Sequence, residues 1–215
     1  MGLHTEAAAL SHDIDFFGNR ADALAAGRDW KAKTNIADFD DYTPNAAVVV
    51  VEIDSEKHGI DFMSSIAGVD STELRERAVQ VQAPGYDFYV MHPLHVMQSQ
   101  LENVYGSLRR RNDPNGEYYA GRVALAIQVA GVSISDLLDA KRTRDALRFS
   151  ERMGQLALSN PGLNAWLRDG VDVLDAIQEH SGWPGKFVSK RLPQIRDQVQ
   201  VERDKFVKLT VRAKR

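Results

Sequence analysis

The continuous apolar run Ala46–Val51 constrains the fold of this 215-residue chain more than any other segment. Its valines favour extended backbone, and an apolar run without polar alternation is typical of a strand that is buried on both faces. The polar segment Ser55–Gly59 follows and ends in glycine, which indicates a turn. The apolar segment Ile60–Ser64 then predicts a second strand, so that the two strands would form a hairpin.

The rest of the first 90 residues alternates between short strand and helix patterns. Ile14–Phe17 is a short apolar run, and Asn19–Gly27 has the pattern of a helix with an Asn cap and a glycine stop. Ser71–Arg77 predicts a short helix. Two further strands are predicted at Val79–Gln82 and Phe88–Met91, on either side of a Pro-Gly turn.

The pattern changes at His92-Pro93, because proline favours the first position of a helix. Apolar residues then recur at spacings of three and four, which indicates one helical stripe: Leu94, Met97, Leu101, Val104 and Leu108. The same periodicity predicts helices at about 117–130, 142–158 and 193–211. The sequence therefore predicts an α+β fold, with a small mixed β-sheet and flanking helices followed by an all-helical domain.

Composition excludes several classes of protein. The contents of 43% hydrophobic and 27% charged residues are those of an ordinary soluble globular protein. Cysteine is absent, which excludes disulfides, thiolate metal sites and cysteine nucleophiles. The first ten residues lack the basic start and apolar stretch of a signal peptide, and Ala46–Val51 is too short to span a bilayer. We therefore expect a cytoplasmic protein without a membrane partner.

Charge is distributed unevenly along the chain, although the formal net charge is only −3. Residues 1–108 carry 7 Lys and Arg against 17 Asp and Glu, whereas residues 141–215 carry 16 against 9. An acidic front suits a metal site, and a basic rear suits a polyanion such as RNA or nucleotide phosphates. The alternative interpretations are that the two halves attract each other or that both are ordinary solvated surfaces.

Three aspartates form the candidate site. Asp13 and Asp15 stand two residues apart in a strand pattern, so their carboxylates would project from the same face. The same spacing at Asp38 and Asp40 is interpreted as that of ordinary surface acids. Asp61 lies within an apolar strand, where a lone carboxylate is costly without a partner. It is either a structural residue, in a turn or paired with an arginine, or the third member of the cluster.

A cluster of three carboxylates has a specific chemical use. Oxygen ligands of this kind suit hard cations such as Mg²⁺ or Mn²⁺. Three acids can hold two metal ions, which stabilise both the attacking and the leaving oxygen of a phosphoryl transfer. The metal ions also neutralise negative charge on a triphosphate.

Three features of the chain together resemble the nucleotidyltransferase fold superfamily: Asp13-Ile14-Asp15, Ile60-Asp61-Phe62, and His92-Pro93 at the start of a helix. The similarity covers about residues 2–108 and extends to small prokaryotic members, including toxins of abortive-infection and toxin–antitoxin systems. The resemblance implies a nucleotidyltransferase core in residues 1–92 and a helical domain in residues 93–215. It also implies that Asp13 and Asp15 bind metal, with Asp61 as a further ligand or as the base for the acceptor hydroxyl.

The chain departs from this family before the paired aspartates. Family members carry a Gly-Ser or Gly-Gly pair at a helix N-terminus, about ten residues earlier, whose backbone N–H groups hold the triphosphate. Here Gly2 is followed by leucine, and the hydroxyls of Thr5 and Ser11 would complete the nucleotide-binding set. The strand and helix that precede the pair in the family have no counterpart, so we expect either an N-terminally truncated member or a degenerate relative.

Two functions follow from these residues. The leading hypothesis is a metal-dependent nucleotidyltransferase that moves a nucleotidyl group from an NTP to RNA, a protein or a small molecule. The resemblance implies a toxin of a toxin–antitoxin pair, with an antitoxin protein as partner. The alternative is a catalytically degenerate scaffold of the same fold that binds a partner protein or nucleic acid. The three acids favour the enzyme, and the missing Gly-Ser pair favours the scaffold.

Overall fold

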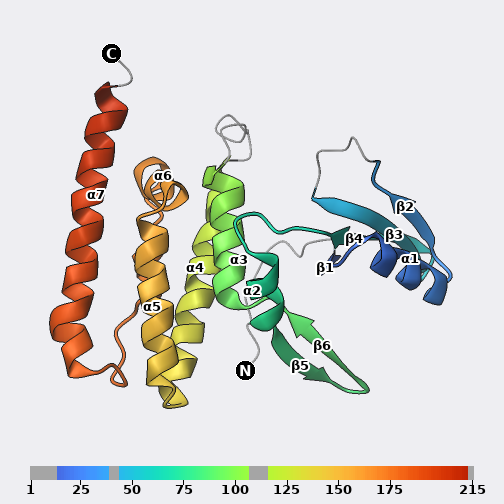
Figure 1. Ribbon diagram of the computed structural model, residues 1–215, viewed down its shortest axis with the longest axis horizontal. Helices are drawn as coiled ribbons and strands as arrows, with labels where there is room; N and C mark the ends of the chain where they lie inside the picture. Colours follow the sequence, from blue (N-terminus) through green and yellow to red (C-terminus); the bar gives the residue numbers. More distant parts are fainter. Residues whose placement is uncertain (1–13, 39–43, 107–115, 213–215) are drawn as a thin grey trace. The chain divides into compact units, whose positions relative to one another are not determined.

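The computed structural model describes residues 14–38, 44–106 and 116–212, and it divides the chain into two compact units, Met1–Ile66 and Ala67–Arg215 (Figure 1). The predicted α+β class is confirmed, because a small mixed sheet precedes a mainly helical region. Contacts divide the chain after residue 66, whereas the change of sequence pattern at His92-Pro93 predicts a boundary after residue 92. The reason is that the later strands form a separate sheet and do not join the first one.

The described residues of the first unit form one sheet and one helix. Its strands lie in the order β1-β4-β3-β2, with β1 parallel to β4 and the other neighbours antiparallel. The elements are β1 (Ile14–Phe17), α1 (Arg20–Asp29), β2 (Lys33–Ile36), β3 (Asn45–Ile53) and β4 (Glu56–Met63). Helix α1 covers one face, where its Ala23 joins a small core whose other members come from the sheet: Ala47, Val49, Ile60 and Phe62.

Helix α1 begins as predicted, with Asn19 as its N-cap, but the prediction that it stops at Gly27 is wrong. The helix continues to Asp29, and Gly27 has another role. A Cβ atom at this position would lie 2.0 Å from the Thr34 Oγ1 atom, so the glycine permits close approach of helix and sheet. The C-cap that ends the helix is Trp30, and Lys31 after it has a left-handed φ of 53°.

The hairpin of β3 and β4 is confirmed, although its turn is shorter than predicted. Only Asp54 and Ser55 form the turn, and both have positive φ angles, 51° and 66°. This geometry is that of a tight two-residue hairpin turn. The valine-rich strand is not equally buried on both faces, because α1 covers Val49 while Val48 and Val50 stay partly exposed on the other face.

The second unit is mainly helical. Its regular elements are α2 (Ser71–Glu76), β5 (Val79–Ala83), β6 (Tyr86–Val90), α3 (Pro93–Leu101), α4 (Gly116–Asp139), α5 (Thr143–Ala157), α6 (Asn160–Asp169) and α7 (Leu192–Arg212). A π-helical segment, Glu102–Gly106, extends α3, and another, Phe187–Arg191, precedes α7. A 3₁₀ turn at Val173–Ala176 follows α6.

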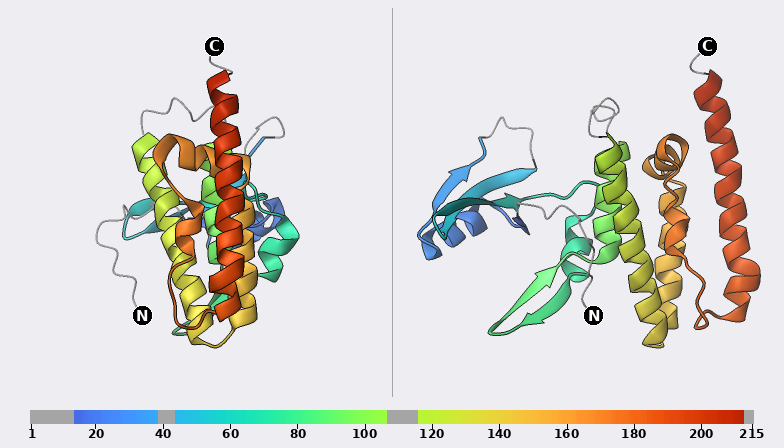
Figure 2. Two further views of the ribbon diagram at one scale, coloured as in Figure 1. Left: turned by 90° about the vertical axis from the view of Figure 1, so that its left-hand side faces the viewer. Right: turned by 180° about the vertical axis from the view of Figure 1, so that it is seen from behind.

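A continuous apolar core holds these helices together. Helices α4, α5 and α7 run alongside one another (Figure 2). The stripe predicted for α3 is confirmed at Leu94, Met97, Leu101 and Val104, which are buried in this core, whereas Leu108 lies outside the described residues. In α5, Phe149 and Met153 occupy the same core. Packing of amphipathic faces therefore fixes this unit, as the helical periodicity predicted.

Helix α4 is the most apolar helix of the second unit. Within the described residues, its segment Tyr119–Asp139 is the one helical stretch long and apolar enough to cross a membrane. Length and composition alone make weak evidence, because a core helix of a compact domain has the same properties. In this unit Val123, Ile127 and Ile134 of α4 are buried in the core.

Candidate functional site

The structure places two of the predicted aspartates side by side. Asp15 on β1 and Asp61 on β4 are Cα partners in the parallel register of these strands. Phe62, next to Asp61 in the chain, is buried in the core with Ala23 of α1. Because neighbouring side chains of a strand point to opposite faces, Asp15 and Asp61 both project from the face that α1 does not cover. Asp15 is exposed and Asp61 is partly buried.

The other predicted site residues lie outside the described residues. These are the metal ligand Asp13 and the nucleotide-binding residues Gly2, Thr5 and Ser11. In the part of the chain that the structure describes, no group of three or more His, Asp or Glu side chains is close enough to hold a metal ion. The structure therefore describes two of the three predicted carboxylates, Asp15 and Asp61.

The chemistry of this pair fits a hard divalent cation. Side chains of paired residues on neighbouring strands have Cβ atoms about 5 Å apart, so one ion can bridge both carboxylates. Carboxylate oxygens are the donors that Mg²⁺ takes, usually one or two from protein together with water and substrate phosphate. On the other side of Asp61, Val48 is its register partner on β3, so the polar pair borders an apolar strand.

Further polar groups lie at the end of the sheet where β1, β4 and β2 finish, and the sequence pattern did not indicate that they are close together. The N–H of Gly18 donates to the Met63 carbonyl at 3.0 Å, which ties the start of α1 to the end of β4. The Arg20 guanidinium donates to the Ala37 carbonyl at 2.5 Å, which ties α1 to the segment after β2. Asp38 follows directly and is exposed. This edge carries the carboxyl ends of β1, β4 and β2, where open sheets commonly bind ligands.

Two sequence features could have indicated that polar groups meet at this end of the sheet. Gly18-Asn19 comes between a strand and a helix, the context in which a Gly-Ser pair holds phosphate. The second pair of aspartates, Asp38 and Asp40, comes after the next strand, and Asp40 lies outside the described residues. The spacing alone indicates ordinary surface acids, and strand β2, with the sequence Lys-Thr-Asn-Ile, has no apolar pattern that would indicate otherwise.

The N-terminus of α1 is occupied by its own side chains. The Asn19 Oδ1 atom accepts hydrogen bonds from the N–H groups of Ala21 at 2.8 Å and Asp22 at 3.1 Å. The Asp22 carboxylate accepts from the N–H of Asn19 at 2.7 Å. This capping box satisfies donors that would otherwise bind an anion, and the negative charge of Asp22 opposes phosphate there.

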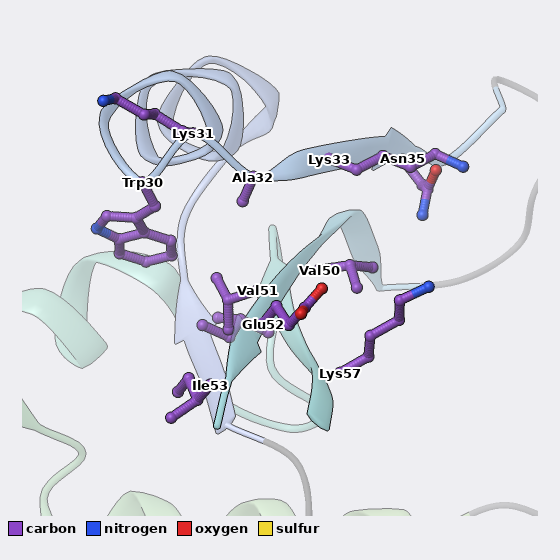
Figure 3. A pocket seen from close by; sticks show the side chains of 11 residues that line it. Trp30, Lys31, Ala32, Lys33, Asn35, Val50, Val51, Glu52, Ile53 and Lys57 are labelled. Atoms are coloured by element: carbon purple, nitrogen blue, oxygen red, sulfur yellow. The ribbon is translucent and has the colours of Figure 1, made fainter. Parts of the chain in front are cut away.

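A shallow groove of about 940 Å³ lies at the opposite end of the sheet, near the turn between β3 and β4 (Figure 3). Trp30, Lys33, Ile53 and Lys57 are among the residues that line it, whereas Asp15 and Asp61 are not. The groove is therefore separate from the carboxylate pair. Its chemistry, aromatic and cationic, also differs.

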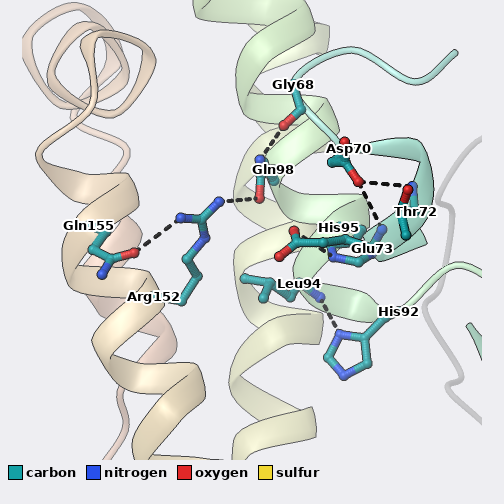
Figure 4. A network of polar contacts seen from close by, with 10 residues as sticks. All are labelled: Gly68, Asp70, Thr72, Glu73, His92, Leu94, His95, Gln98, Arg152 and Gln155. Carbon is teal, nitrogen blue, oxygen red and sulfur yellow. Dashed lines mark hydrogen bonds and ion pairs between the residues drawn. The ribbon is translucent and has the colours of Figure 1, made fainter. Parts of the chain in front are cut away.

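The second unit contains a polar cluster between α2, α3 and α5 (Figure 4). The Gln98 side chain donates to the Gly68 carbonyl, and the Arg152 guanidinium donates to the Gln98 Oε1 atom at 3.3 Å. Asp70 caps α2 by accepting from the N–H groups of Thr72 and Glu73. These bonds connect the ends of the two shorter helices to α5, so the cluster has a clear structural role.

Two histidines belong to this cluster, His92 before α3 and His95 within it. His92 caps the helix, since its Nδ1 atom accepts from the Leu94 N–H at 3.2 Å. His95 is 1% exposed, and among the described residues its Nδ1 atom has no hydrogen-bond partner. Burial lowers the pKa of both residues; for His95, Arg77 adds to this effect while the Glu73 carboxylate opposes it. Burial therefore favours the neutral form of both histidines, and it weakens the charged character of the 4.0 Å contact between His95 and Glu73.

Comparison with known proteins finds no matching family model, no similar curated protein and no similar solved structure. The assignment of function therefore depends on the geometry of the chain's own residues.

Proposed function

We propose that the first unit is a metal-dependent nucleotidyltransferase domain in which Asp15 and Asp61 bind Mg²⁺ or Mn²⁺. The observation that carries this proposal is their register: two carboxylates stand side by side on the open face of the sheet. Together with Asp13 they would supply the acidic set that phosphoryl transfer requires. The donor is an NTP, and the acceptor is RNA, a protein or a small molecule.

The residues of this unit would divide the work as follows. Asp15, the more exposed of the pair, binds the cation on its solvent side. Asp61 is partly buried between Asp15 and Val48, so its carboxylate is the better oriented one, as ligand or as base for the acceptor hydroxyl. A bound divalent cation neutralises charge on the triphosphate. Arg20 places a positive charge at the same edge of the sheet as Asp38.

A second ligand set is available for the same activity. Asp38 stands at the carboxyl edge next to the Arg20 contact and belongs to the other D-x-D pair, with Asp40. Strand β3 lies between β2 and β4, so this second set would not include Asp61. Substitutions at Asp15 and Asp38 therefore distinguish the two ligand sets.

The scaffold function keeps one specific observation in its favour. Asp22 and Asn19 already satisfy N–H groups at the α1 N-terminus, the described helix start next to the Asp15 strand, so few donors remain there for a phosphate. In this alternative the first unit binds no nucleotide, and the basic second half of the chain binds a partner protein, such as an antitoxin, or RNA.

Metal binding is tested with the full chain by thermal unfolding with and without Mn²⁺. An ion that binds only the folded state at about 100 times its Kd adds about 2.7 kcal/mol of stability. We expect a rise in the Tm of the first unit that Asp61→Asn removes. Asp15→Asn should remove it as well, because Asp15 is the register partner of Asp61. Loss of the response in Asp38→Asn alone would instead assign the ion to the segment after β2. The matched control is Asp54→Asn, the same change in the exposed hairpin turn.

Transfer is tested separately, with α-labelled NTP and RNA or protein acceptors. We expect metal-dependent incorporation of label that Asp61→Asn abolishes and Asp54→Asn preserves. An equal metal response in the wild type and the Asp61→Asn variant would place the ion elsewhere and sink the proposed site. A normal metal response without any transfer would leave the scaffold as the function.

A further inference from the structure

The groove at the hairpin end of the first sheet combines an aromatic side chain with several cations (Figure 3). Trp30, the residue that ends α1, borders it on one side, and Lys33 and Lys57 border it on the other. Between them runs β3, which extends beyond its pairing with β2, since Lys33 pairs with Val50 and β3 continues to Ile53. The groove thus crosses an open strand edge.

The indole of Trp30 is held in place yet stays accessible. Its ring centroid lies 6.3 Å from that of Phe16 and 6.5 Å from that of Phe62. Phe62 is buried in the core, whereas Trp30 is 46% exposed. Ile53, also in the groove, is 56% exposed. A fixed aromatic ring with one free side is a platform on which a planar group can stack without loss of side-chain freedom.

The charged residues of the groove favour an anion. Its lining contains the three lysines Lys31, Lys33 and Lys57 against the single acid Glu52. Glu52 is the register partner of Lys57 on the neighbouring strand, so it offsets one of these charges locally. The excess of positive charge is notable because the front half of the chain is strongly acidic. A flat ring flanked by cations is complementary to a nucleobase joined to phosphates.

We propose that this groove, defined by Trp30, Lys31, Lys33, Glu52, Ile53 and Lys57, binds single-stranded nucleic acid. A base stacks on Trp30, and the phosphates on either side of it approach Lys33 and Lys57 across the edge of β3. Stacking on an aromatic ring and contacts to phosphate carry little sequence information, so binding is tolerant of sequence. The groove does not include the carboxylate pair, and it would bind a strand whether or not Asp61 binds metal.

A single strand fits better than a free nucleotide for a geometric reason. The aromatic and cationic sides of the groove are separated by β3, and a continuous backbone can cross that edge with phosphates on both sides of the stacked base. A mononucleotide can engage one side at a time. We therefore expect a single-stranded oligonucleotide of about ten residues to bind at least tenfold more tightly than a mononucleotide.

The test uses the full chain, with anisotropy of a labelled single-stranded RNA of about ten nucleotides at low salt, and Trp fluorescence as a second readout. We expect quenching of the exposed Trp30, and roughly tenfold weaker binding for Trp30→Ala. Because Trp30 contacts Phe16, the double variant Lys33→Ala, Lys57→Ala provides a test that leaves the aromatic packing intact. Its slope of log K against log salt should become shallower by about 1.4, or about 0.7 for each lost phosphate contact.

A matched control separates the groove from the basic second half of the chain. The double variant Lys186→Ala, Lys208→Ala removes the same charge from exposed positions outside the groove. Unchanged affinity and salt slope in this control, with losses in both groove variants, support the proposal. Wild-type affinity in both groove variants would overturn it and assign any binding to the second half. Equal affinity for oligonucleotide and mononucleotide, or no binding below about 1 mM, would overturn it as well.

Discussion

The two units of the chain differ most in the size of their cores. Among the described residues, the core of the first unit has five buried hydrophobic residues, whereas that of the second has 26. A small sheet with one covering helix buries little apolar area, and such units are marginal in stability unless a ligand, metal or partner adds to it. The second unit requires no such addition. The difference suggests that binding to the first unit would be measurable as stabilisation.

The largest expected effect on the difference in stability between the units comes from a cavity in the core of the second unit. Met153 of α5 is 0% exposed in the core, and Met153→Ala should cost about 2–5 kcal/mol. We expect two unfolding transitions in urea, the first unit at lower concentration, with only the second transition moved by this variant. The matched change is Val49→Ala in the first core, which should move only the first transition. A single shared transition in all variants would show that the units unfold as one.

A smaller effect concerns the close contact of α1 with β2. An added methyl group in a helix normally stabilises it, yet Gly27→Ala would place a Cβ atom 2.0 Å from the Thr34 Oγ1 atom. We expect a loss of about 1–3 kcal/mol in the first transition, as is usual for overpacking. Thr34→Ala in the same chain should recover most of it. If Gly27→Ala stabilises the first unit on its own, Thr34 turns away and the contact does not limit the helix.

Gly27 and the buried core positions show which parts of the fold could be predicted from the sequence. The apolar stripes of α3, α5 and α7 predicted their helices closely, because each buries one face in a large core. Gly27 was interpreted as a stop because a sequence pattern does not reveal a close approach between a helix and a strand. Strand β2 was missed for a related reason: it lies at the sheet edge and shows no apolar alternation. Helix α6 was missed because Asn160-Pro161-Gly162 has the composition of a turn.

The candidate site could be predicted from the sequence only in part. The strand patterns around Asp15 and Asp61 implied carboxylates on a common face, and the parallel register places these two side by side. The position of Asp38 near Arg20 could not be predicted, since it depends on a hydrogen bond between segments 17 residues apart. Nor could the sequence indicate that the Asp22 carboxylate accepts a hydrogen bond from the Asn19 N–H at the start of α1. Only the capping geometry shows which N–H groups remain for a ligand.

The pH dependence of stability should differ between the units. The folded pKa values of His92 and His95 lie below the usual value, chiefly through burial, so the folded state takes up protons less readily than the unfolded state. Their contribution is therefore complete above about pH 6.5 and is lost as the pH falls through the folded values. Thermal unfolding from about pH 8 to pH 5 should show a decreasing Tm for the second unit.

A matched pair of variants assigns this response. His95→Gln should flatten the decrease in the Tm of the second unit, because Gln keeps a polar side chain but does not titrate. His58→Gln changes a histidine of β4 in the first unit and should leave that decrease unaltered. A slope that persists in the His95→Gln and His92→Gln variants would assign the pH response to other groups, such as the Glu151 carboxyl, whose hydrogen bond from Arg191 lowers its pKa.

The smallest expected effect uses a feature that both units share. Lys31 after α1 and Lys141 after α4 have φ angles of 53° and 57°, a left-handed conformation that favours glycine at the end of a helix. Lys31→Gly and Lys141→Gly should each stabilise their own unit by about 0.5–1 kcal/mol, by release of strain. Urea unfolding would measure each transition separately. Only Lys31→Gly also removes a cation from the groove, so it should weaken RNA binding while it stabilises the fold. Equal RNA affinity in the Lys31→Gly and Lys141→Gly variants would mean that Lys31 takes no part in binding. The only effect of either substitution would then be the gain in stability from released strain.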